Sequence, residues 1–227
     1  MTFHKHLLIV LAAVTLALSG VATANPILRV SSAGVVIQVA DNGAGDLDPG
    51  VGSVLFVGAV GGWDTNITSG LGSAILGPNE LDLNTNSAIS RNGSFVHPLV
   101  LELTEMGFTG GLGGIAAFLG TIGGTTDGTI SWWLYIDPTD AAFGQAYEVA
   151  SGTKIPGLGF LDSDSGLVDL SMGGSGYSMT LRVEINHSNK PTGTSFNFRG
   201  QLVPEPGTLL LLGVGLIGVA LARRKLS

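Results

Sequence analysis

The chain contains no cysteine, and this absence excludes several kinds of chemistry at once. There is no thiol nucleophile, no thiolate to bind zinc or an iron–sulfur cluster, and no disulfide to brace a small fold. A domain of about 180 residues does not need disulfides, because it buries roughly 70% of the surface that its unfolded chain exposes. Length and composition therefore favour one domain with a core of its own.

Basic residues are also scarce. The sequence holds 10 lysines and arginines against 17 aspartates and glutamates, which gives a formal net charge of −7. All 17 acidic residues but only six basic ones fall between Asn25 and Pro206, so this part of the chain is more acidic than the whole. Nucleic-acid binding needs a basic surface to neutralise phosphates, and we therefore expect no nucleic-acid partner.

A sustained helical pattern of apolar residues is missing between Asn25 and Pro206. Apolar and polar residues alternate there with a period of two, and glycine, asparagine, aspartate and proline separate the alternating segments. We expect strands at Leu28 to Ser31, Val35 to Val39, Ser53 to Val60, Leu81 to Asn84, Leu99 to Glu105, Thr129 to Ile136, Met179 to Ile185 and Ser195 to Leu202. The pattern predicts an all-β body over residues 25–202, built as an antiparallel β-sandwich of Ig-like or jelly-roll type.

Long apolar runs occur only at the two ends of the chain. At the start, Lys5 lies in a short basic region and is followed by an apolar stretch from Leu7 to Leu18. Ala22 and Ala24 then form an A-x-A cleavage site. This order is typical of a secretory signal peptide, so residues 1–24 are expected to be removed and the mature chain to begin at Asn25.

At the other end, an uncharged run from Thr208 to Ala222 precedes the basic residues Arg223, Arg224 and Lys225. As a helix, the uncharged stretch from Gly207 to Ala222 spans roughly 24 Å, less than the hydrocarbon core of a bilayer. The long arginine side chains can reach the headgroups and extend it. We expect a single membrane-spanning helix with a basic stop on the cytoplasmic side.

The tail as a whole resembles a known sorting signal. Pro204, Glu205 and Pro206 stand before the apolar helix and the basic stop, and this order resembles the PEP-CTERM signal that exosortases process in bacteria that make extracellular polysaccharide. The resemblance implies a sorting domain at residues 203–227, export through the inner membrane, transient anchoring there and exosortase as a partner. Processing would then leave the protein at the cell surface or outside the cell.

The body also resembles those often found ahead of such a tail. The resemblance rests on two segments, Asp41 to Leu47 and Tyr177 to His187. It supports a sandwich fold and implies no catalytic residue.

Catalytic motifs are weak, and we expect no enzyme. His97 and His187 are the only histidines of the mature chain and stand beside turn residues, so both are expected on exposed loops. No G-x-S-x-G elbow occurs. Gly111 to Ala116 fits the letters of a dinucleotide loop, but no helix has room to follow it, which indicates a glycine-rich loop. Glu102 and Glu105 are expected to face opposite sides of a strand, unlike a glycosidase pair.

Metal binding has more support. Asp41, Asp46 and Asp48 cluster around glycines, and Asp162, Asp164 and Asp169 form a second acidic group. Calcium takes six or more oxygen ligands, which acidic turns supply. Aspartate and glycine are equally the ordinary residues of β-turns. Calcium at Asp41, Asp46 and Asp48 is therefore a candidate, and the expectation otherwise is that the body has no cofactor.

Two function classes remain open. One is a structural or adhesive surface protein linked to exopolysaccharide or biofilm. The other is a carbohydrate- or calcium-binding module, in which exposed aromatic residues stack on sugars. The candidates for such residues are Trp63, Trp132, Trp133 or Tyr135; Trp132 and Trp133 are expected to point to opposite faces, so that one of the two is exposed. The PEP tail also occurs on proteins labelled ice-binding, but Thr121, Thr125, Thr126 and Thr129 do not form the regular threonine rows of an ice-binding face.

Overall fold

The computed structural model describes residues 25–91, 97–171, 173–187 and 192–204. Within these ranges no helix is long and apolar enough to cross a membrane. Several residues of the predicted sorting signals lie outside the described residues: Ala22, Ala24, Glu205, Pro206, Arg223, Arg224 and Lys225.

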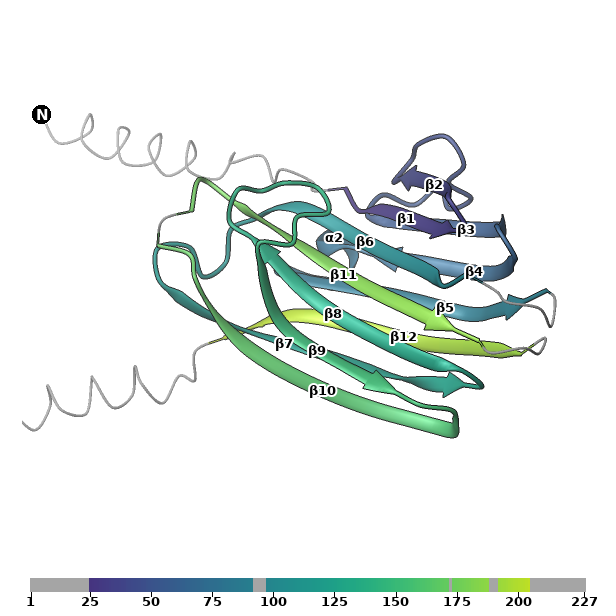
Figure 1. Ribbon diagram of the computed structural model, residues 1–227. Coiled ribbons are helices and arrows are strands. Elements are labelled where there is room, and N and C mark those ends of the chain that lie inside the picture. The colour runs from purple at the N-terminus through teal and green to yellow at the C-terminus, as the bar shows by residue number, and fades with distance from the viewer. Residues whose placement is uncertain (1–24, 92–96, 172, 188–191, 205–227) are drawn as a thin grey trace, which may run out of the picture.

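The body consists of two antiparallel sheets of six strands each, which face one another (Figure 1). In order across the first sheet, here called sheet A, the strands are β2 (Val35–Ala40), β1 (Ile27–Ser32), β6 (Leu99–Phe108), β11 (Tyr177–Asn186), β8 (Thr129–Asp137) and β9 (Tyr147–Lys154). In sheet B the order is β10 (Gly157–Asp169), β7 (Ile115–Thr126), β12 (Gly193–Val203), β5 (Glu80–Ser90), β4 (Trp63–Leu71) and β3 (Ser53–Val60). One helical turn, α2 (Ser73–Leu76), joins β4 to β5. The predicted all-β antiparallel architecture is confirmed.

The core lies between the sheets and is filled by alternate residues of the strands. Leu101 and Leu103 of β6 and Leu181 of β11 are fully buried there. Trp132 of β8 meets Phe198 of β12 edge to face, with ring centroids 5.2 Å apart. Because each strand shows one apolar side to this layer, the two-residue period of the sequence fixes which side chains point outward.

Four strands had not been expected: β4, β7, β9 and β10. The predicted glycine-rich loop is confirmed only for Gly111 to Gly114, since β7 begins at Ile115 and continues through three further glycines. At one of these, Gly120, a methyl group would lie 2.9 Å from the Trp132 ring. Glycine here makes room for a large side chain of the facing sheet, so its presence did not indicate a loop.

The second acidic group was expected in a turn-rich loop, and this is wrong, because all three of its aspartates lie on β10. Asp164 accepts a hydrogen bond from the Ser151 backbone N–H at 3.0 Å. Asp162 accepts one from Trp132 Nε1 at 3.2 Å and lies 3.2 Å from Lys154 Nζ. These two carboxylates therefore connect the edge of sheet B to the edge of sheet A.

Candidate functional site

A row of charged and aromatic side chains crosses the outer face of sheet A. Arg29 of β1 lies opposite Glu102 of β6, Glu102 lies opposite Arg182 of β11, and Arg182 lies opposite Trp133 of β8. Each of these residues alternates with core residues of its own strand, which places all four on the outside. We call this set, Arg29, Glu102, Arg182 and Trp133, the transverse row.

Glu102 is the centre of the row and is nearly covered, with 7% of its side chain exposed. Its Oε2 lies 2.6 Å from Arg29 Nε, and its Oε1 lies 3.9 Å from Arg182 Nε. Gln145 also donates a hydrogen bond to Oε1 at 3.2 Å. One carboxylate thus holds two guanidinium groups in fixed positions on the sheet surface.

The same guanidinium groups lie against aromatic rings. Arg182 Cζ is 4.6 Å from the centre of the Trp133 ring, and Arg29 Cζ is 3.9 Å from the centre of the Phe143 ring. Tyr135 lies two residues from Trp133 on the same side of β8, and both are partly exposed. Burial, and next the negative charge of Glu148, raise the pKa of the Tyr135 hydroxyl, which keeps it a neutral hydrogen-bonding group.

The connection between β8 and β9 folds over one end of this face. The backbone N–H of Phe143 donates to Thr104 Oγ1 at 3.2 Å, and Ser178 Oγ donates to the Ala141 carbonyl at 2.6 Å. At the other end a hollow of about 470 Å³ lies beside the β1–β2 turn and is bordered by Glu184, which pairs with Arg182 at 3.0 Å. The transverse row therefore lies between the β8–β9 connection at one end of the face and the hollow beside the β1–β2 turn at the other.

Two of the four aromatic residues that were candidates for stacking on sugars are not exposed to a ligand. Trp63 and Trp132 are fully buried, so the prediction of Trp63 as an exposed residue is wrong, and Trp133 is the partly exposed member of the pair Trp132 and Trp133. Trp63 donates from Nε1 to the His97 carbonyl at 2.8 Å, and Trp132 packs in the core. The prediction that Trp132 and Trp133 point to opposite faces is confirmed, and Trp133 and Tyr135 remain as the partly exposed pair.

The three calcium candidates lie in the connection between β2 and β3 and already accept hydrogen bonds from this connection and from the start of β3. Asp41 accepts from the Gly52 N–H at 2.7 Å, and Asp46 accepts from the Leu55 N–H at 2.9 Å. The N–H of Gly50, and next the Ser53 hydroxyl, lower the pKa of Asp48. In the part of the chain that the structure describes, no three His, Cys, Asp or Glu residues form a group that could hold a metal ion.

The two histidines differ. His97 is exposed as predicted, whereas His187 is only 4% exposed, and its prediction as an exposed loop residue is wrong. Its ring nitrogens lie 3.2 Å from Ser90 Oγ and 2.8 Å from Thr194 Oγ1, so it joins the end of sheet A to sheet B. Burial lowers its pKa. The alternation of β11 carries on past the strand and points residue 187 inward, a signal that the sequence already contained.

Glu102 and Glu105 face opposite sides of β6, as predicted. Glu105 points to the inner side, is fully buried and accepts hydrogen bonds from both the N–H and the hydroxyl of Ser73. The two-residue alternation of the strand predicted at Met179 to Ile185 places Arg182 on the outer face, but the sequence indicates no role for Arg29, Phe143 or Gln145. No local signal could have found them, because their partners lie on strands 39 or more residues away.

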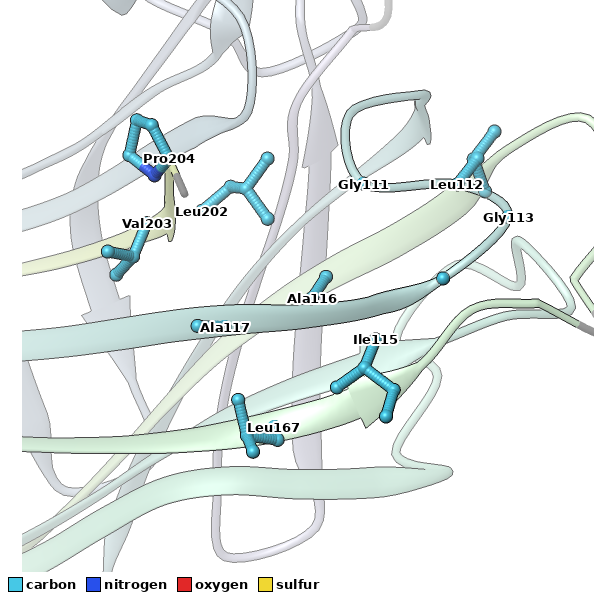
Figure 2. A pocket seen from close by; sticks show the side chains of 11 residues that line it. Gly111, Leu112, Gly113, Ile115, Ala116, Ala117, Leu167, Leu202, Val203 and Pro204 are labelled. Atoms are coloured by element: carbon cyan, nitrogen blue, oxygen red, sulfur yellow. The ribbon is translucent and has the colours of Figure 1, made fainter. Parts of the chain in front are cut away.

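A separate hollow of about 540 Å³ lies where sheet B ends (Figure 2). It is lined by residues 111–117, Leu167 and Leu202 to Pro204, all of them glycine or apolar. Leu167 of β10 and Val203 of β12 lie on either side of Ala117 of β7, whose small side chain leaves the space open. Pro204, the first residue of the predicted sorting motif, lies at its edge.

Residues 202–225 match the PEP-CTERM protein-sorting motif, which confirms the identification of the tail and marks the chain as an exported protein sorted by exosortase. No curated protein matches the chain.

Solved structures resemble the body only distantly. A Bacillus subtilis arabinoxylan arabinofuranohydrolase of glycoside hydrolase family 43 has 13% identity and a TM-score of 0.30 over 56% of this chain and 27% of that one. The K1 cleaved adhesin domain of Lys-gingipain from Porphyromonas gingivalis has 10% identity and a TM-score of 0.34 over 68% of this chain and 99% of that one. A carbohydrate-binding module of the β-sandwich superfamily has 12% identity and a TM-score of 0.30 over 80% and 75%. These likenesses concern the arrangement of strands alone.

Proposed function

We propose that this exported, exosortase-sorted chain is a structural or adhesive protein of the cell surface or extracellular matrix, and that the transverse row makes its contact with exopolysaccharide. The observation that carries the proposal is the fixed arrangement of two guanidinium groups around Glu102, next to the partly exposed Trp133.

The chemistry of the row matches what a sugar chain offers. Aromatic rings supply broad, rigid contact surface at low entropic cost, as Trp133 and Tyr135 do here. Charged hydrogen-bonding groups orient hydroxyl or carboxylate groups beside such a ring. Because Glu102 already holds Arg29 and Arg182 in place, little further ordering is needed when a ligand binds.

We propose binding without catalysis. Glu102 and Glu105 point to opposite sides of β6 and cannot flank one glycosidic bond. Glu102 is already engaged by two arginines and an amide, as a positioning group would be. The calcium candidates likewise accept hydrogen bonds within their own loop, so the proposal includes no resident cofactor.

The test is a binding assay with exopolysaccharide purified from the producing cell. Trp133→Ala should weaken binding about tenfold or more, since aromatic residues at the centre of a contact carry much of its energy. Tyr147→Ala is the matched control. Tyr147 is also an exposed aromatic residue of sheet A, with 50% exposure, but it is paired in register with Ile136 and is not part of the transverse row. Equal binding by Trp133→Ala and the parent would refute the proposed surface.

The sorting part of the proposal has its own test. Replacing Pro204, Glu205 and Pro206 with alanine should leave the protein held in the membrane, because the apolar run and basic stop remain. Deleting residues 207–227 should instead release the protein, and its measured mass should be that of a chain that begins at Asn25. Release of the alanine variant in the same form as the parent would show that exosortase does not process this tail.

A further inference from the structure

The apolar hollow at the end of sheet B differs from the rest of an acidic body. Every residue that lines it is glycine or apolar, although the chain carries 17 acidic residues. Figure 2 shows Ile115 and Leu167 side by side on β7 and β10, beside the start of the tail at Val203 and Pro204. Ile115 is 65% exposed and Leu167 is 70% exposed. A water-facing surface of this kind calls for something to cover it.

The position of the tail identifies what covers it. Pro204 borders the hollow, and the apolar run begins at Thr208. Four residues span at most about 14 Å when fully extended. When the run is in the bilayer, the hollow must therefore lie within that short reach of the membrane surface.

We propose that this end of the sandwich rests on the lipid surface before the tail is cleaved, with Ile115 and Leu167 in the boundary between headgroups and acyl chains. The inference rests on the membrane insertion of the tail that the proposed sorting includes. Two apolar side chains are too few to hold a protein on a bilayer without an anchor, so cleavage makes this contact reversible. The membrane-bound precursor thus has a defined orientation, in which the end of the sandwich that carries Ile115 and Leu167 faces the membrane.

The absence of cysteine allows a direct test. The full chain is expressed in a host that has no exosortase, and single variants Ile115→Cys and Leu167→Cys are labelled with the fluorophore NBD. They are reconstituted into phosphatidylethanolamine–phosphatidylglycerol vesicles with and without brominated acyl chains, which quench NBD on contact. Ile155→Cys is the matched control, since Ile155 is 76% exposed and lies in the turn before β10, at the other end of that strand from Leu167 (Figure 1).

We expect the brominated lipid to quench NBD at positions 115 and 167 and to leave position 155 unchanged. A Leu212→Cys variant separates the two proposals, because it reports whether the tail is inserted. Quenching at 212 without quenching at 115 and 167 overturns the surface contact and leaves the sorting proposal standing. No quenching at 212 overturns both. Energy transfer between labels on two copies, with no effect of bromination, would assign the surface to a second copy of the chain and overturn the lipid contact.

Discussion

The outer faces of the two sheets share one core but present different chemistry. On sheet A, the transverse row combines two arginines, a glutamate and a tryptophan. The equivalent row across the middle of sheet B runs from Thr121 of β7 through Arg199 of β12 to Asp82 of β5. Beside it, Asn197 lies opposite Asn84.

Among the described outward positions of β7, β12 and β5 none is aromatic. The alternation that builds the core is the same in both sheets, so it does not decide what the outside can bind. That is decided by the side chains at the outward positions, where sheet A concentrates large, charged and aromatic groups and the middle of sheet B keeps mostly short polar ones.

The strongest way to break this comparison is to remove a carboxylate from each face. Glu102→Ala should lower the free energy of unfolding by about 2–4 kcal/mol, because it leaves two partly buried guanidinium groups without their shared partner. Glu80→Ala on sheet B removes the partner of Arg199, whose side chain is 43% exposed, and should cost below about 1 kcal/mol. Urea unfolding measures both, and equal losses would show that the faces are not different.

A second pair of substitutions compares the faces without touching a charge. Trp133→Ala should lower the free energy of unfolding by about 1 kcal/mol, since the ring is partly exposed and the Arg182 guanidinium lies against it. Thr121→Ala, in the corresponding middle row of sheet B, should change stability by less than about 0.5 kcal/mol. A loss for Trp133→Ala as large as that of a core tryptophan would mean that this ring supports the fold rather than a binding surface.

The pH dependence of stability tests the interior between the two faces, where His187 is buried. The folded-state pKa of His187 lies below 6.5 because burial disfavours its charged form, partly offset by Asp127. The unfolded chain therefore takes up the proton first, and stability that is complete above about pH 6.5 is lost as pH falls through the folded-state pKa.

Urea unfolding from pH 7 down to about 5.5 should show this fall, and it should be smaller than the loss from Glu102→Ala. His187→Gln should remove it, whereas His97→Gln, at an exposed position, should keep it. A slope that survives in His187→Gln would assign the pH dependence to another group.

The smallest effect concerns the β2–β3 connection, which belongs to neither face. Calcium at about 1 mM should leave the thermal midpoint within about 1 °C of its value in chelator. The reason is that Asp41, Asp46 and Asp48 already accept hydrogen bonds from backbone N–H groups of the loop. A clear rise, lost in Asp46→Asn, would restore these residues as a calcium site.

The strands and the inward or outward direction of their residues followed from the sequence wherever large apolar residues alternate. The outward direction of Arg182 could be predicted in this way, and so could the opposite directions of Trp132 and Trp133. Strand β7 could not, because its glycines make room for Trp132 of the other sheet, and that contact is not local.

The candidate site shows the same limit. Its aromatic half is visible within β8, but its charged half needs β1, β6 and β11 to be neighbours. Arg29 and Glu102 are 73 residues apart in the chain, and no pattern in either segment indicates that the two residues pair. Pairing over such distances is set by the whole fold rather than by local preference.

The last strand before the tail, β12, lies in the middle of sheet B, between β7 and β5. During export the chain crosses the membrane from its beginning to its end, so β12 is the last strand to arrive. Until then β7 and β5 lack the strand that pairs with both of them. Sheet B is complete only after Val203 has crossed, and under the proposed sorting the apolar run that begins four residues after Pro204 would by then be at the bilayer. The proposed sorting would therefore make completion of the fold and arrest of the tail coincide, so that the body would reach its final form while still tethered to the membrane.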